Sequence, residues 1–154
     1  MNLRTATEAD LLTLAALFRE TVLVNAPQYY TPAQTEAWAA IDAHSPRFHQ
    51  FILGVTTYVA EDDTGILGFA GIGDDGYVAS VYVHHDCLHQ GIGSILMQAV
   101  LAHAQENQVH RLYAEASEFS LRLFQKFGFS QYDTEVVDRN GVQFTRYLVE
   151  RVLI

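Results

Sequence analysis

In the first third of the chain, apolar side chains recur at helical spacing, and three N-cap signals mark where helices should begin. These signals are Thr7, Thr31-Pro32 and Ser45-Pro46, where Ser or Thr accepts from free backbone amides and proline suits the first turn. Before the first signal, Leu3–Ala6 has the composition of a short strand. Gly54 is placed to end the helix that Ser45 begins. The N-terminal region is therefore predicted to be an opening strand followed by helices.

The next region changes to β-branched and aromatic residues separated by turn sequences. Thr56–Glu61 and Ile66–Ile72 flank the hairpin turn Asp62-Asp63-Thr64-Gly65. A second turn, Asp74-Asp75-Gly76, leads into Tyr77–Val83. This pattern predicts three antiparallel strands.

The second half of the chain alternates between helical and strand patterns. The predicted elements are a helix from Ile92 to about Asn107, a strand Leu112–Ala116, a helix Glu118–Phe127 ended by Gly128, and two strands around a type I′ turn at Asn140-Gly141. The fold class that follows is α/β: a single domain over residues 1–154 with a mixed, mainly antiparallel sheet flanked by helices.

Composition narrows the classes of partner and compartment. Nine basic against 18 acidic residues give a net charge of −9, which argues against a nucleic-acid partner. No apolar run approaches the length of a membrane span and the N-terminus lacks a secretory signal, so we expect no membrane partner and a cytoplasmic location. Cys87 is the only cysteine, so no internal disulfide can form. A homodimer is among the oligomeric states that the sequence leaves open.

The candidate chemistry begins in the segment His89-Gln90-Gly91-Ile92-Gly93-Ser94, between a predicted strand and a predicted helix. Glycines there let backbone N–H groups approach an anion, and a helix N-terminus adds roughly half a positive charge. Taken alone, the segment fits a ligand-free turn equally well. It is not a Walker motif, because no Gly-Lys-Ser/Thr has the required spacing.

The stretch from Tyr77 to Phe129 resembles the GNAT superfamily of N-acetyltransferases. Its first signature is similar to the Gly91-Ile92-Gly93 segment, and its second to the run that ends in Phe127-Gly128-Phe129. The resemblance implies direct transfer of an acetyl group from acetyl-CoA, as co-substrate, to a small-molecule or peptide amine. It also implies that the strands Tyr77–Val83 and Leu112–Ala116 are parallel and splay apart, and that no metal is needed.

The same resemblance implies where the cofactor is held. The amides of Gln90–Ser94 take the pyrophosphate, and the backbone of Val81–Val83 pairs with the pantetheine arm. The full set of expected cofactor-binding residues is Val81, Tyr82, Val83, Leu88, His89, Gln90, Gly91, Ile92, Gly93, Ser94, Ser117 and Phe124.

Three positions depart from the family pattern. Leu88 replaces a Gln or Arg that contributes to phosphate binding, Phe124 replaces a tyrosine that protonates the thiolate, and Ala79 replaces an acidic residue near the amine. These departures keep a second hypothesis open, namely a degenerate acyl-CoA-binding module that regulates without catalysis.

Catalytic candidates must therefore come from other positions. Glu115 is a candidate base and Tyr82 a candidate acid, against the alternatives of a solvated strand carboxylate and a packed aromatic ring. Ser117 can contact the cofactor, cap the following helix, or do both.

Two other groups of residues carry side chains with functional chemistry. His84, His85, Asp86, Cys87 and His89 are the densest set of ligand-type side chains. A strand end followed by a loop does not bring His85 and His89 together, so we expect no metal site from this segment. A metal-binding or redox protein that uses Cys87 and its histidines is the third hypothesis that stays open. Trp38, Tyr29 and Tyr30 are candidates for the acceptor pocket or, equally, for core packing.

Overall fold

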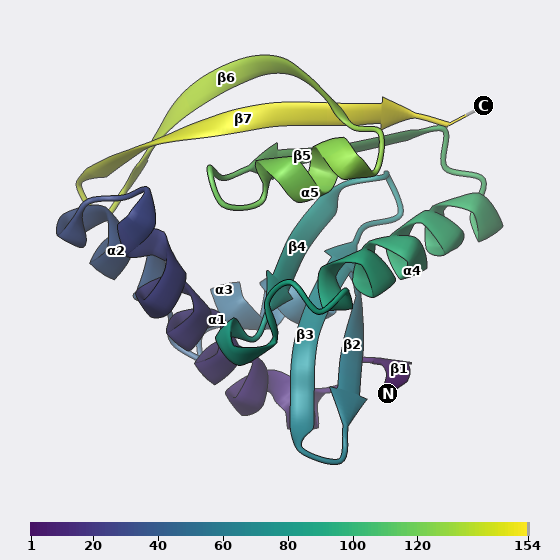
Figure 1. Cartoon of the computed structure of the whole chain (residues 1–154), viewed down its shortest axis with the longest axis horizontal. Helices are drawn as coiled ribbons and strands as arrows, with labels where there is room; N and C mark the ends of the chain where they lie inside the picture. Colours follow the sequence, from purple (N-terminus) through teal and green to yellow (C-terminus); the bar gives the residue numbers. More distant parts are fainter. Residues whose placement is uncertain (154) are drawn as a thin grey trace.

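The computed structural model describes residues 1–153, which form two antiparallel sheets with helices against them (Figure 1). The first sheet has the strand order β1-β2-β3-β4 and contains β1 (Asn2–Thr5), β2 (Thr56–Asp62), β3 (Gly65–Ile72) and β4 (Val78–Val83). The second has the order β5-β7-β6 and contains β5 (Arg111–Ala116), β6 (Ser130–Arg139) and β7 (Val142–Val152). The predicted α/β class is confirmed.

Five α-helices occur within residues 1–153. They are α1 (Leu11–Asn25), α2 (Pro32–Ala39), α3 (Pro46–Leu53), α4 (Ile92–Glu106) and α5 (Leu121–Lys126). The predicted caps of α2 and α3 are confirmed, since the hydroxyls of Thr31 and Ser45 each accept a backbone N–H bond of 3.1 Å from three residues ahead. No helix in this part of the chain is both long and apolar enough to cross a membrane.

The first sheet separates two hydrophobic clusters, and β3 contributes to both. On one face Phe69 packs with Leu14 of α1 and Ile52 of α3. On the other face Ala70 packs with Leu96 of α4. A central strand covered on both faces requires a nearly continuous apolar run, which Ile66–Ile72 supplies.

The two sheets meet where β4 and β5 begin. Within residues 1–153 these strands share one parallel bridge, between Tyr77 and Tyr113, and the Tyr113 N–H donates to the Gly76 carbonyl at 3.1 Å. Beyond this bridge β4 pairs with β3 alone. One edge of β4 is therefore free of strand partners.

Several predicted boundaries were wrong. The strand after the second turn begins at Val78, with Tyr77 contributing only the bridge. The predicted helix start at Glu118 is replaced by a turn, because the Ser117 and Ser120 hydroxyls each accept the backbone N–H of the other residue at 3.0 Å. The helix α5 therefore begins at Leu121, and Ser117 caps the turn before it.

The predicted turn glycines behave as expected. Asn140 and Gly141 have φ angles of 53° and 80°, as a type I′ turn between β6 and β7 requires. Gly128 has φ of 84° after α5. There the Phe129 N–H donates to the Phe124 carbonyl at 3.1 Å, and the two rings pack edge to face with centroids 5.0 Å apart. This Schellman motif fixes the direction in which the Phe124 ring points.

Candidate active site

The loop before α4 presents a row of free backbone amides. Gly91 occupies the N-cap position with φ of 84°, which an amino acid with a side chain adopts only under strain. In the described part of the chain, no protein group accepts a hydrogen bond from the N–H groups of residues 88–94. We call these seven amides the amide cradle. Together with the positive end of the α4 dipole they suit an anionic group.

A lysine that the sequence analysis did not single out lies beside this cradle. Lys126 of α5 donates from Nζ to the Ser94 hydroxyl at 2.8 Å. No carboxylate among residues 1–153 lies within ion-pair distance of Lys126. The sequence did offer a signal, because Lys126 is the only lysine in a chain of net charge −9. Lys126 places one uncompensated positive charge at the cradle.

The cradle also lies against the end of β4. A Cβ atom added to Gly93 would stand 3.3 Å from the Leu123 side chain of α5 and 3.6 Å from that of Val83. Gly93 therefore allows β4, α4 and α5 to approach one another closely.

The free edge of β4 exposes backbone groups in a defined alternation. The His84 N–H donates to the Leu67 carbonyl at 2.7 Å, so these two residues form a hydrogen-bonded pair. Such pairs alternate with non-bonded ones along antiparallel strands. The backbone of Tyr82 therefore faces β3, whereas the backbones of Val81 and Val83 face the free edge.

One of these outward groups already has a partner. The Thr21 hydroxyl of α1 donates to the Val83 carbonyl at 3.1 Å. The Val81 N–H and carbonyl and the Val83 N–H remain for an extended ligand along the edge.

A cavity of about 590 Å³ opens along this edge, between β4 and the end of β5. Five of the predicted site residues line it: Val81, Tyr82, Glu115, Ser117 and Phe124. Residues 83 and 88–94 do not, because they lie at the amide cradle. The structure thus divides the predicted site residues between a cradle and a cavity, which the free edge of β4 connects.

Tyr82 is half-buried on the cavity wall and stacks on Phe69 with ring centroids 5.4 Å apart. Its hydroxyl accepts a hydrogen bond of 3.4 Å from Nε1 of Trp38, which leaves its own proton available. Burial raises the pKa of Tyr82 to about 12. The phenol is therefore protonated at neutral pH and able to donate.

Glu115 projects into the cavity in a polar cluster. Arg146 of β7 lies 3.7 Å from its carboxylate and also donates from Nε to Glu135 at 2.9 Å. Burial, followed by the hydrogen bond to Glu115, raises the pKa of Tyr77. Glu115 is therefore a positioned carboxylate with defined neighbours.

Two departures from the family pattern also lie on the cavity wall. Ala79 and Phe124 both line it, and Phe124 is 4% exposed. Neither carries a titratable group, so the wall lacks an acid or base at both positions.

The aromatic candidates separate into two groups. Tyr30 and Trp38 line the cavity and pack edge to face at 5.3 Å, and the Tyr30 hydroxyl accepts the Glu118 N–H at 2.9 Å. Tyr29 is 54% exposed and lies outside the lining. Neither of the two roles considered for Tyr29, acceptor-pocket contact or core packing, therefore fits its position.

The histidine-rich segment does not form one cluster. His89 is exposed with φ of 63°, whereas His84 and His85 stack at the end of β4 with ring centroids 4.4 Å apart. Asp86 donates its backbone N–H to Nδ1 of His84 at 3.1 Å.

The known proteins that this chain resembles are named as acyltransferases or acetyltransferases. The L-amino acid N-acyltransferase MnaT of Escherichia coli (strain K12) is 29% identical over 165 residues, which cover 96% of this chain and 89% of that protein. A GCN5-related N-acetyltransferase from Rhodopseudomonas palustris has a similar structure, with a TM-score of 0.93 at 24% identity over 99% of this chain and 95% of that one. The acetyltransferase yncA from Salmonella typhimurium, solved with acetyl-CoA, has a TM-score of 0.72 at 22% identity over 100% and 94%.

The family model for the acetyltransferase (GNAT) domain matches residues 27–151, most of the chain. That range contains the amide cradle, β4, β5 and most of the cavity lining. The chain belongs to the GNAT family of acetyltransferases.

Proposed function

We propose that this chain transfers the acetyl group of acetyl-CoA directly to a primary amine held in the cavity. The observation that carries the proposal is the continuous path from the amide cradle, along the free edge of β4, into the cavity. The pyrophosphate binds the amides of residues 88–94 with Lys126 beside them. The pantetheine arm pairs with Val81 and Val83, and the thioester enters the cavity. The Salmonella relative with bound acetyl-CoA supports this assignment of the cofactor.

The reaction needs only groups that this arrangement provides. The amine nitrogen attacks the thioester carbonyl, the tetrahedral intermediate collapses, and the CoA thiolate leaves. Glu115, directly or through water, accepts the amine proton. Tyr82 donates a proton to the thiolate, and backbone N–H groups of β4 stabilise the oxyanion. No acetyl-enzyme forms.

L-Amino acids are the first acceptors to test. The MnaT relative carries that substrate class in its name. In the cavity lining, Arg47 and Arg139 have no carboxylate within ion-pair distance among residues 1–153, so either suits a substrate carboxylate. Aromatic side chains of Tyr30, Trp38 and Phe144 offer an apolar wall.

The test is release of free CoA with a panel of L-amino acids, each paired with the amine that lacks its carboxylate. We expect equimolar CoA and N-acetylated product with at least one primary amine, and a lower KM for the amino acid of that pair. Acetyl-CoA that binds yet acetylates no amine above background hydrolysis would contradict the proposal and favour a regulatory binding module.

A further inference from the structure

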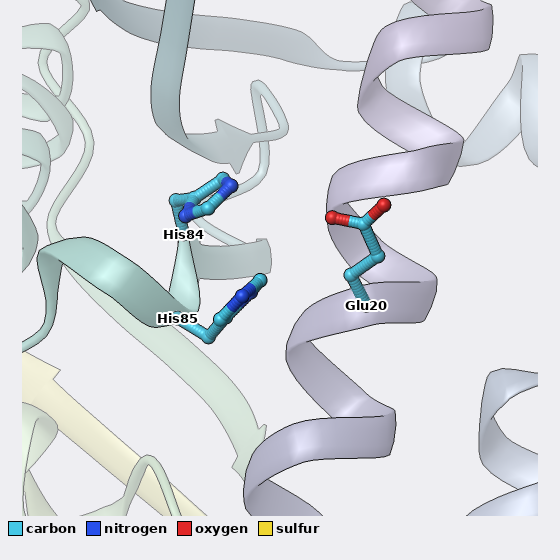
Figure 2. A group of neighbouring side chains, drawn as sticks. All are labelled: Glu20, His84 and His85. Carbon is cyan, nitrogen blue, oxygen red and sulfur yellow. The ribbon is translucent and has the colours of Figure 1, made fainter.

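Three ligand-type side chains from separate elements converge beside the end of β4 (Figure 2). They are Glu20 of α1 and the consecutive residues His84 and His85, and one ligand atom of each lies within 4.8 Å of the others. Figure 2 shows Glu20 on its helix with one carboxylate oxygen on the side of the two imidazoles. His84 and His85 stood out in the sequence as ligand-type residues, but Glu20 did not, because it belongs to a helix far away in the chain.

The backbone around this group is held on both sides. The Thr21 hydroxyl, one residue after Glu20, donates to the Val83 carbonyl at 3.1 Å. The His84 N–H donates to the Leu67 carbonyl at 2.7 Å. Because α1 and the end of β4 are fixed to each other here, the three side chains face each other without rearrangement of the fold.

The Asp86 carboxylate lies near one nitrogen of each imidazole. Its oxygens are 3.5 Å from Nε2 of His85 and 4.0 Å from Nδ1 of His84. Metal-binding histidines commonly donate their second nitrogen to such a carboxylate. With Asp86 in that role, Nε2 of His84 and Nδ1 of His85 are the nitrogens available to an ion.

Nδ1 of His85 is the second observation that points to an ion. It is buried and has no hydrogen-bond partner among residues 1–153. A buried polar atom without a partner carries a desolvation cost that a bound ion would remove. The His84 ring accepts the Asp86 N–H at Nδ1, so an ion at Nε2 moves the ring proton to Nδ1. The Asp86 N–H then loses this acceptor, and the Asp86 carboxylate, 4.0 Å away, has to move closer to accept the Nδ1 proton.

We propose that Glu20, His84 and His85 bind a divalent transition-metal ion, with Zn²⁺ the best match. Two imidazoles and one carboxylate form a familiar zinc ligand set that leaves the fourth position open. Bonds of about 2.0–2.1 Å separate tetrahedral ligand atoms by about 3.4 Å, so atoms that now lie up to 4.8 Å apart must approach by up to about 1.4 Å. Glu20 is exposed and can do so by a change of rotamer.

The bound ion would join α1 to the segment that leads into the amide cradle. The net charge of −9 favours cation binding over the whole surface. The proposal does not rest on acetyl transfer, since none of the three ligands lines the cavity or belongs to the amide cradle. If the protein binds no metal at these residues, the proposed acetyl transfer is unaffected.

The test uses full-length protein without a histidine tag, treated with chelator and titrated with Zn²⁺ by calorimetry. Titration with Co²⁺ reports coordination geometry through its visible absorption. We expect one equivalent of Zn²⁺ to bind and to raise the temperature of unfolding. Glu20→Gln, His84→Gln and His85→Gln should each weaken binding at least 10-fold, and Asp86→Asn about 10–100-fold.

His44→Gln is the matched control, because His44 is exposed and lies outside the group. Circular dichroism checks that each variant is folded, which is expected at these partly exposed positions. The proposal is overturned by no Zn²⁺ binding at micromolar concentration, or by binding that His44→Gln weakens as much as the other variants do. Full affinity in Glu20→Gln would equally overturn the three-ligand site.

Discussion

Removing a proton from the acceptor is the larger of two energetic demands on the side chains around the cavity. An alkylamine with a pKa of about 10.4 requires about 4 kcal/mol to lose its proton near pH 7.5. A thiol with a pKa of about 8.5 costs only about 1.4 kcal/mol to leave as thiolate at that pH. Loss of Glu115, the proposed base, should therefore slow acetyl transfer more than loss of Tyr82, the proposed acid.

Glu115→Gln should lower kcat by about 10²–10⁴-fold, because a positioned base contributes that much to proton transfer. Acetyl-CoA affinity should stay unchanged, since Glu115 is not at the amide cradle. The control is Glu135→Gln, which removes the other partner of Arg146 without altering a residue of the cavity lining. Equal rates for wild type and Glu115→Gln would exclude Glu115 as the base.

Phe124→Tyr tests whether this ring lies near the thiolate. A phenol with a pKa of about 10 is protonated at neutral pH and would donate to the leaving group. Because the thiolate penalty is small, turnover should rise only several-fold, most at low pH. Phe127→Tyr adds a phenol just after α5 but outside the cavity lining and should change nothing. If both variants fold and turn over like wild type, either Tyr82 already supplies the proton or chemistry does not limit the rate.

Helix and strand ends were the least predictable parts of each element. The caps at Thr31 and Ser45 and the Asn140-Gly141 turn were confirmed because their conformations depend on local backbone chemistry. The start of α5 was missed because the hydroxyls of Ser117 and Ser120 each accept the backbone N–H of the other serine, which forms a turn before the helix. Both serines satisfy the cap pattern, and sequence alone does not rank them.

At the start of the fold, one carboxylate binds two neighbouring residues. Asp10 is 8% exposed, accepts two bonds of 2.8 Å from Arg4, and closes the capping box by accepting the Thr7 N–H at 2.8 Å. The hydrogen bond from Arg4, more than any other cause, lowers the pKa of Asp10. The ionised carboxylate of Asp10 therefore has more favourable interactions in the folded state than in the unfolded chain, and its ionisation stabilises the fold.

Asp10→Asn should reduce the free energy of unfolding by about 1–3 kcal/mol at neutral pH, the range for hydrogen bonds to charged groups. The stabilising effect of ionised Asp10 is fully present above the unfolded pKa of about 3.9 and is lost as pH falls through the lower folded value. The difference between wild type and variant should therefore shrink below about pH 4. Urea unfolding at several pH values measures it, with the exposed Asp63→Asn as control. A difference that is independent of pH would contradict this account.

Over the whole molecule, the sequence predicted the order of elements and the cofactor loop but not the convergence of distant side chains. Periodicity and turn chemistry act over a few residues, so the strands and helices could be predicted from them. The approach of Lys126 to Ser94, of Arg146 to Glu115, and of Glu20 to His84 depends on tertiary packing. That the whole chain is one domain stays a prediction from its length.

The surface charge leads to a prediction about acceptors. A net charge of −9 repels polyanions at long range and attracts cations. Acidic peptides should therefore be acetylated more slowly than basic or neutral peptides of the same length at low ionic strength, and salt should narrow the gap. Rates for such matched peptides measure it. A strongly acidic peptide that reacts as fast as the others at low salt would contradict the prediction.

The central claim, that acetyl-CoA is held on the amide cradle, is tested most directly by calorimetric titration of acetyl-CoA into three proteins: wild type, Gly91→Val and Gly141→Val. Both glycines have φ near +80° (84° and 80°) and open space around an added Cβ, so both variants carry similar backbone strain. Only Gly91 lies at the cradle. We predict one equivalent of acetyl-CoA bound by wild type and by Gly141→Val, with at least 10-fold weaker binding to folded Gly91→Val. Equal affinity in all three proteins would contradict the account.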